Sequence, residues 1–98
     1  MMVYEVTATV ADEHRAEYER YMRDRYIPDL MKTGCFDGAA IELSAQGRYR
    51  VRYIAPSRDE LDRYMTDHAP RLRADFVEHF PSGAELSREE WNVLETFA

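Results

Sequence analysis

The stretch EYERYMRD at residues 17–24 is repeated, with five identities, as ELDRYMTD at residues 60–67. The same offset of 43 residues aligns the alternating segment 5–10 with segment 48–53, so each copy has a strand-like pattern followed by a helix-like one. Self-similarity of this kind indicates a duplicated structural unit. In a chain of 98 residues it predicts a single domain, residues 1–98, made of two similar halves.

Alternation of apolar and polar side chains predicts four strands. They cover residues 2–10, 36–44, 48–54 and 90–97. The third strand has the clearest pattern, because tyrosine and valine alternate with arginine in RYRVRY at residues 48–53. The fourth strand is predicted to place Trp91, Val93 and Phe97 on one side.

Two helices are predicted, one after the first strand and one after the third. Asp12 is the expected N-cap of the first helix, and Ser57 with Glu60 forms a capping box for the second. A proline interrupts each helix, Pro28 in the first and Pro70 in the second. The first copy has one residue more than the second before its proline.

The order strand, helix, strand, strand, helix, strand predicts a ferredoxin-like βαββαβ fold of the α+β class. Its four-stranded antiparallel sheet is expected in the spatial order 4-1-3-2, with both helices on one face. The other face then carries Arg48, Arg50 and Arg52 between the acidic residues Glu5 and Glu42. Because a charged face of this kind makes a poor core, we expect two copies to bring these faces together in a homodimer.

Composition and charge exclude several functions. A net charge of -6 disfavours binding to nucleic acid, and no segment has the length and hydropathy of a signal peptide or a membrane span. We therefore expect a cytoplasmic protein without a membrane or nucleic-acid partner. Cys35, the only cysteine, is expected to be a small buried hydrophobe. His68 and His79 are too far apart on a helix to share a metal, and no cofactor is expected.

Three short segments resemble a small uncharacterised bacterial family of the dimeric α/β-barrel superfamily: YIP at residues 26–28, TGCF at 33–36 and HAPRLR at 68–73. The resemblance covers the whole chain and implies that two ferredoxin-like protomers pack sheet against sheet into a closed barrel. It does not select an activity, because the superfamily includes cofactor-free monooxygenases, muconolactone-type isomerases, dye- and haem-handling enzymes and stress-responsive proteins. Family members often carry histidine where this chain has Tyr26. The resemblance places HAPRLR near a ligand site.

The first hypothesis for function is a homodimer that binds a small organic molecule and has no assigned activity. Its candidate ligand-binding residues are Arg50, Arg52, Glu5 and Arg71. Guanidinium groups bind carboxylates in a bidentate manner, so the arginine row is suited to an anionic ligand. The alternative for this row is a charge lattice in the dimer interface, neutralised by Glu5 and Glu42.

Two further hypotheses stay open. The chain is either a cofactor-independent monooxygenase or isomerase, in which His68 moves a proton and Tyr26 hydrogen-bonds a substrate oxygen, or a structural dimer that binds another protein. The enzyme hypothesis requires a cavity of roughly 300 Å³ or more that His68 or Tyr26 reaches. Tyrosines on the helices and strands, such as Tyr18 and Tyr53, are expected to form either the wall of such a cavity or a solid core.

Overall fold

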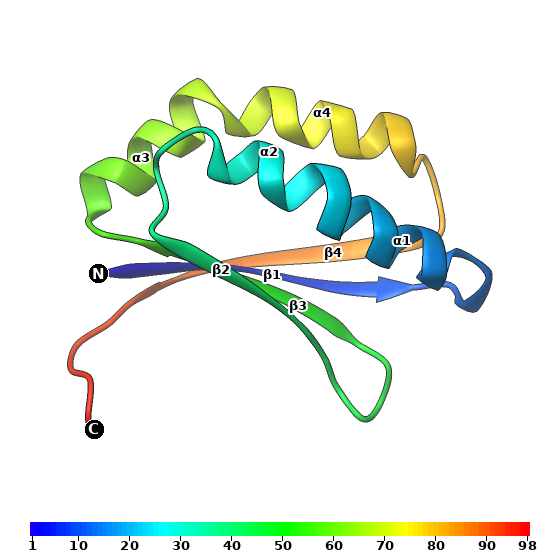
Figure 1. The fold of residues 1–98 in the computed structure, drawn as a ribbon, viewed down its shortest axis with the longest axis horizontal. Coiled ribbons are helices and arrows are strands. Elements are labelled where there is room, and N and C mark those ends of the chain that lie inside the picture. The colour runs from blue at the N-terminus through cyan, green and yellow to red at the C-terminus, as the bar shows by residue number, and fades with distance from the viewer.

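The chain folds into one four-stranded sheet covered on one face by a single layer of two helical segments that lie side by side (Figure 1). The computed structural model describes residues 1–98. Along the chain the elements are β1 (Met2–Val10), the 3₁₀ turn η1 (Asp12–His14), α1 (Arg15–Tyr21), the π turn η2 (Met22–Tyr26), α2 (Ile27–Met31), β2 (Gly38–Leu43), β3 (Tyr49–Ala55), α3 (Arg58–Asp67), α4 (Ala69–His79) and β4 (Ala84–Asn92).

The sheet has the order β2-β3-β1-β4, and all neighbouring strands are antiparallel. This confirms the predicted ferredoxin-like fold and strand order. Figure 1 shows α1 to α4 on one side of the sheet and only the C-terminal segment on the other. We call that other side the uncovered face. It carries residues from all four strands: Val3, Glu5, Thr7, Ala40, Glu42, Arg50, Arg52, Ile54, Ser87, Glu89 and Trp91.

The duplicated sequence corresponds to duplicated structure. Arg15 and Arg58, the first residues of α1 and α3, are 43 positions apart. Tyr21 and Tyr64 occupy equivalent positions in the two copies, and both are buried in the core. The repeat therefore reflects two helices that present the same side to one core.

The first helical segment is a continuous helix whose middle turn is widened. The π turn η2 separates α1 from α2, and Pro28 lies in the first turn of α2. Proline has no N–H to donate to the preceding turn, and its ring crowds the carbonyl there. A widened turn before the proline relieves both effects. The predicted cap at Asp12 was wrong, because Ala11 takes that position and the Asp12 carboxylate lies 3.8 Å from Arg15.

The second helical segment begins and breaks where the sequence predicts. Ser57 caps α3, its hydroxyl oxygen accepting a hydrogen bond from the Glu60 N–H at 3.2 Å. The Glu60 carboxylate instead binds Arg63 at 2.6 Å, so only half of the capping box forms. His68 lies between α3 and α4, and Pro70 is in the first turn of α4.

The last strand differs from the prediction. β4 covers Ala84–Asn92 instead of residues 90–97, and Trp91 lies on the uncovered face. Its helix-facing side continues from Ala84 and Leu86 to the charged Arg88, which interrupts the apolar alternation. The apolar residues of segment 90–97 gave a stronger pattern but belong mainly to the C-terminal segment, where Leu94 and Phe97 are exposed.

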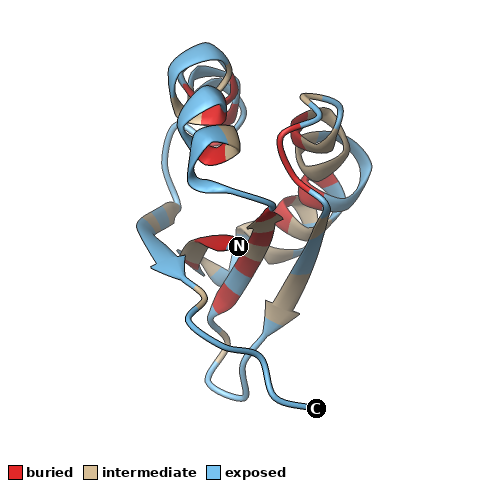
Figure 2. Ribbon diagram, turned by 90° about the vertical axis from the view of Figure 1, so that its left-hand side faces the viewer, coloured by how far each residue is buried: buried red, intermediate tan, exposed pale blue.

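The core fills the space between the sheet and the helices and is rich in aromatic residues. Figure 2 shows the buried segments on the inner sides of both layers. Six tyrosines are buried: Tyr4, Tyr18, Tyr21, Tyr49, Tyr53 and Tyr64. Cys35 is fully buried, which confirms its predicted role as a small hydrophobe. None of the helices is long and apolar enough to cross a membrane.

Gly83 makes the tight connection from α4 to β4, and we expect its replacement by alanine to destabilise the fold. Its φ of +86° is left-handed, and a Cβ there would lie 2.4 Å from Cδ2 of His14. Gly83→Ala should lower the free energy of unfolding by about 1–2 kcal/mol for the backbone alone, measured by urea denaturation. The matched control is Gly38→Ala, whose Cβ has nothing within 4 Å.

The double variant His14→Ala/Gly83→Ala should recover only the part of the lost unfolding free energy that comes from the contact between the new Cβ and His14. Equal urea midpoints for Gly83→Ala and the wild type would contradict this geometry.

Candidate functional site

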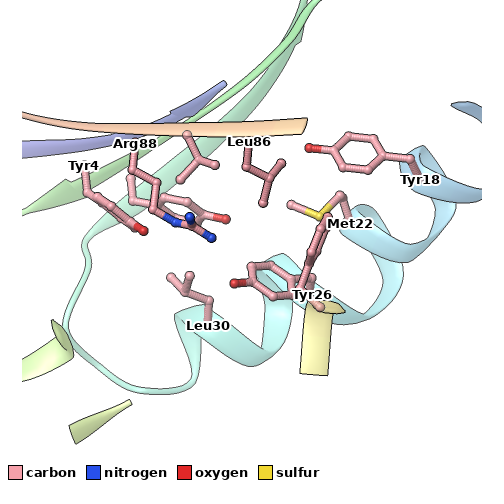
Figure 3. Close-up of a pocket in the computed structure, with 10 residues that line it drawn as sticks. Tyr4, Tyr18, Met22, Tyr26, Leu30, Leu86 and Arg88 are labelled. Carbon is pink, nitrogen blue, oxygen red and sulfur yellow. The ribbon is translucent and has the colours of Figure 1, made fainter. Parts of the chain in front are cut away.

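A small cavity lies between the sheet and the first helical segment. Figure 3 shows side chains from both layers pointing into it, with Tyr4 and Arg88 from the sheet opposite Tyr26 and Leu30 from the helix. Nine of its ten lining residues are hydrophobic. The lining residues are Tyr4, Val6, Tyr18, Met22, Tyr26, Leu30, Tyr53, Phe76, Leu86 and Arg88.

The cavity is nearly closed in this structure. Its free interior volume is about 10 Å³, about the space that one water molecule needs. Pockets for small organic ligands enclose roughly 300–1,000 Å³, so the closed form does not meet the size expected for an enzyme site. A ligand therefore enters only if lining side chains move. The groups best able to move are Arg88, which is exposed on the edge strand β4, and the half-buried Leu86 and Tyr26.

Three of the four tyrosine hydroxyls at the cavity make no hydrogen bond to the protein: those of Tyr18, Tyr26 and Tyr53. The fourth, Tyr4, accepts a hydrogen bond from Nη2 of Arg73 at 3.2 Å. None of the three oxygens is fully enclosed, because the only buried side-chain polar atoms without a partner are Nε of Arg15 and Nε of Arg73. The unpaired ones thus give this apolar cavity a set of donors for polar atoms of a ligand.

Burial holds these hydroxyls in the neutral form. It raises the pKa of Tyr26 to about 12, although the nearby Arg88 acts in the opposite direction. Burial also raises the pKa of Tyr18 and of Tyr53 above the ordinary tyrosine value. At neutral pH these phenols donate hydrogen bonds and do not act as bases.

A second hollow adjoins the cavity between α4 and β4. It has a volume of about 350 Å³ and shares Tyr4 and Arg88 with the cavity. Arg73 of α4 reaches it and contacts the Met65 sulfur at 3.5 Å. Glu90, also at this hollow, is bound by Arg58 at 2.6 Å. Because this open hollow shares Tyr4 and Arg88 with the tyrosine cavity, we call it the mouth.

The two residues predicted for catalysis do not come together at the cavity. Tyr26 lines it, whereas His68 is half-buried at the junction of α3 and α4 and is not among the lining residues. The His68 side chain makes no hydrogen bond, although its backbone continues the helical hydrogen bonds to Tyr64 and Leu72. The symmetry between the two copies therefore does not place both residues at one opening.

The residues predicted to bind a ligand lie away from the cavity. Arg50 is on the uncovered face, 2.9 Å from Glu42 and 3.5 Å from Glu5. Arg52 and Glu5 line an open hollow of about 480 Å³ on the same face, and Arg71 pairs with Asp75 on the outer side of α4. The expected lattice of charges is therefore present around Arg50.

Sequence reasoning missed Tyr4, Arg73 and Arg88 as site residues. Arg88 was missed because the last strand was predicted too late in the chain, which left residue 88 outside the sheet. Arg73 belongs to the HAPRLR segment, which the family resemblance placed near a ligand. Among the histidines, cysteine and acidic residues, no group of three or more is arranged to hold a metal ion.

Solved structures with the same fold include oxygenases and a heme-degrading protein. SnoaB, a cofactor-independent oxygenase from Streptomyces nogalater, has a TM-score of 0.73 and 12% identity over 97% of this chain and 95% of that one. The monooxygenase ActVA-Orf6 of Streptomyces coelicolor, solved in complex with nanaomycin D, has a TM-score of 0.61 and 15% identity over 99% and 92%. The heme-degrader MhuD of Mycobacterium tuberculosis, solved with two hemes in its active site, has a TM-score of 0.73 and 17% identity over the full length of both chains.

These similarities are too low in identity to show more than the fold. No curated protein matches the chain by sequence. A family profile described as a domain of unknown function, DUF4286, matches residues 1–94. The match extends from the first strand through the last strand to the C-terminal segment. The chain therefore belongs to the DUF4286 family.

Proposed function

We propose that the protein is a homodimeric α/β-barrel protein that binds a small organic molecule in the tyrosine cavity. The main support is the set of unpaired hydroxyls of Tyr18, Tyr26 and Tyr53 around an apolar space. A ligand with an aromatic or aliphatic body and a few polar atoms satisfies both features. That two proteins of the same fold were solved with nanaomycin D and with hemes supports ligand binding by this fold. The proposal keeps the cytoplasmic location predicted from the sequence.

The alternative proposal is a cofactor-independent monooxygenase or isomerase that uses Tyr26 and His68. The oxygenases of the same fold favour it, as does the position of Tyr26 in the cavity wall. Proton transfer near neutral pH, however, needs a base with a matching pKa. The cavity wall contains no histidine, carboxylate or thiol, and its tyrosines are held neutral. Binding is therefore the better-supported function.

The binding proposal predicts that an uncharged aromatic probe perturbs Met22 selectively. With ¹³C-methyl methionine labels, titration with phenol should shift the Met22 methyl resonance, because Met22 lines the cavity, and should leave that of Met31 unchanged. Leu86→Phe fills the cavity from the edge strand and should abolish the shift. Val77→Phe, on the exposed side of α4, is the matched control.

If the Met22 resonance stays unchanged over the whole solubility range of phenol, the cavity does not bind small aromatic molecules. Native mass spectrometry of the purified protein provides an independent test, because a retained natural ligand appears as an added mass.

The raised pKa of the Tyr26 phenol predicts how the stability of the fold depends on pH. The pKa of Tyr26 is about 12 in the folded protein and near 10 when unfolded. Above pH 10 the unfolded chain therefore releases this proton first, and Tyr26 lowers stability by up to about 1.4 kcal/mol per pH unit between pH 10 and 12. Tyr26→Phe should match the wild type at pH 7 and exceed it at pH 11 in urea denaturation. Parallel loss of stability in both proteins would show that the Tyr26 hydroxyl is solvated.

The uncovered face supports the dimer part of the proposal. It combines paired charges with apolar groups, since Arg50 is bound by Glu42 and Glu5, and Nε1 of Trp91 donates a hydrogen bond to Glu5 at 3.1 Å. Trp91 is 49% exposed, and the adjoining Leu94 is 90% exposed. Apolar area next to neutralised charge is typical of a surface that packs against another protein. A second copy of the chain offers the same pattern of charges with the strands reversed.

Charge reversal on this face should weaken the dimer. In Arg50→Glu, three carboxylates meet on neighbouring strands, and we expect the dissociation constant from sedimentation equilibrium to rise at least about tenfold. Thr7→Arg adds bulk and a positive charge to the same face, and Glu42 does not repel that charge. It should also raise the dissociation constant of the dimer. Arg71→Glu on the outer side of α4 should leave association unchanged.

A wild-type protein that remains monomeric at high concentration would overturn the dimer. A heteromeric complex purified from the native host, in place of the homodimer, would instead favour the third hypothesis, a protein-interaction module.

A further inference from the structure

Two arginines meet at the mouth of the tyrosine cavity. Arg88 lines both the cavity and the adjoining hollow, and Arg73 lines the hollow. In Figure 3 the Arg88 side chain extends from the sheet into the space between Tyr4, Leu86 and Tyr26. Burial raises the pKa of Tyr64, and both guanidinium groups are close enough to act in the opposite direction on that hydroxyl. Both positive charges therefore face the same small space.

Neither arginine has a carboxylate within ion-pair distance, although Arg58 of α3 pairs with Glu90 at 2.6 Å in the same region. The hollow contains one further acid, Glu89, which belongs to the uncovered face by its register. The lining of the hollow thus contains two arginines and two glutamates, but Glu90 is paired with Arg58 and no ion pair joins Glu89 to either arginine. Both guanidinium groups therefore have donors that are free to bind an anion: Arg88 is exposed and Arg73 is half-buried.

Arg73 also carries a hydrogen-bond donor without a partner. Its Nε atom is buried and unpaired, while its Nη2 donates to the Tyr4 hydroxyl at 3.2 Å. Because Tyr4 lines the cavity, this hydrogen bond holds the Arg73 guanidinium at the border between polar mouth and apolar interior. An oxygen acceptor placed there would satisfy part of this unused donor capacity.

We propose that Arg73, Arg88 and the Tyr4 hydroxyl form an anion subsite, and that the ligand is a small aromatic or aliphatic acid. Its carboxylate binds the two guanidinium groups at the mouth, and its apolar body occupies the tyrosine cavity. Arginine suits this role because its planar donors match the two oxygens of a carboxylate. The inference rests on the proposed function, since it requires that the cavity binds a ligand.

The test compares two probes of nearly equal shape, benzoate and benzamide, by the shift of the Met22 methyl resonance. Benzamide reports binding in the cavity, and the ratio of the two dissociation constants reports the anion subsite. The wild type should bind benzoate at least about tenfold more tightly than benzamide, because charge-assisted hydrogen bonds contribute that much or more. Arg88→Gln and Arg73→Gln should each bring the ratio close to one, and Arg88→Lys should retain part of the preference.

Arg71→Gln is the matched control, since Arg71 lies on the same helix as Arg73 but pairs with Asp75 outside the cavity. It should keep the wild-type ratio. Equal binding of both probes by the wild type would overturn the anion subsite and leave the cavity's ligand-binding role intact. A preference for benzoate that survives in both glutamine variants would also overturn it. Failure of both probes to shift Met22 would overturn the subsite and the proposed function together.

Discussion

The alternation of side chains along β3 is the constraint on which the rest of the structure depends. Tyr49, Val51 and Tyr53 are buried under the helices, while Arg50 and Arg52 project to the other side. Because side chains in a strand alternate with a period of two, a shift of one residue would move the arginines into the core. The central strand therefore has only one acceptable register, and this register fixes the positions of β1 and β2 beside it.

The fold could be predicted from the sequence wherever local pattern and tertiary environment agree. β1 matches its predicted bounds, and the Ser57 cap and the break before Pro70 follow from the chemistry of those residues. The prediction failed where they disagree. Arg88 occupies a helix-facing position of β4, but on this edge strand its side chain remains exposed, so a charged residue breaks the apolar alternation that would have revealed the strand.

The candidate site could be predicted only in part, because its residues come from seven elements spread over the chain. Tyr26 and His68 were predicted to act together in catalysis, yet the structure places only Tyr26 at the cavity. The side-chain positions of Tyr4 and Arg73 depend on how α4 packs on β1, and no local sequence pattern encodes that packing. The charged face was predicted in part. Arg50 pairs with Glu5 and Glu42, as register and alternation indicate, whereas Arg48 precedes β3 and Arg52 forms no ion pair with either acid.

The widened turn η2 makes the helix of the first copy differ from that of the second in how its side chains are oriented. A π turn accommodates one residue more than an ordinary helical turn, and the first copy has that additional residue before its proline. Removing it would restore helical symmetry and rotate the side chains that precede the residue by about 100° relative to those that follow it. Tyr26, at the end of the turn, would then lose its orientation toward the cavity. One additional residue is thus sufficient to turn Tyr26 toward the tyrosine cavity, whereas α3 of the second copy has no widened turn.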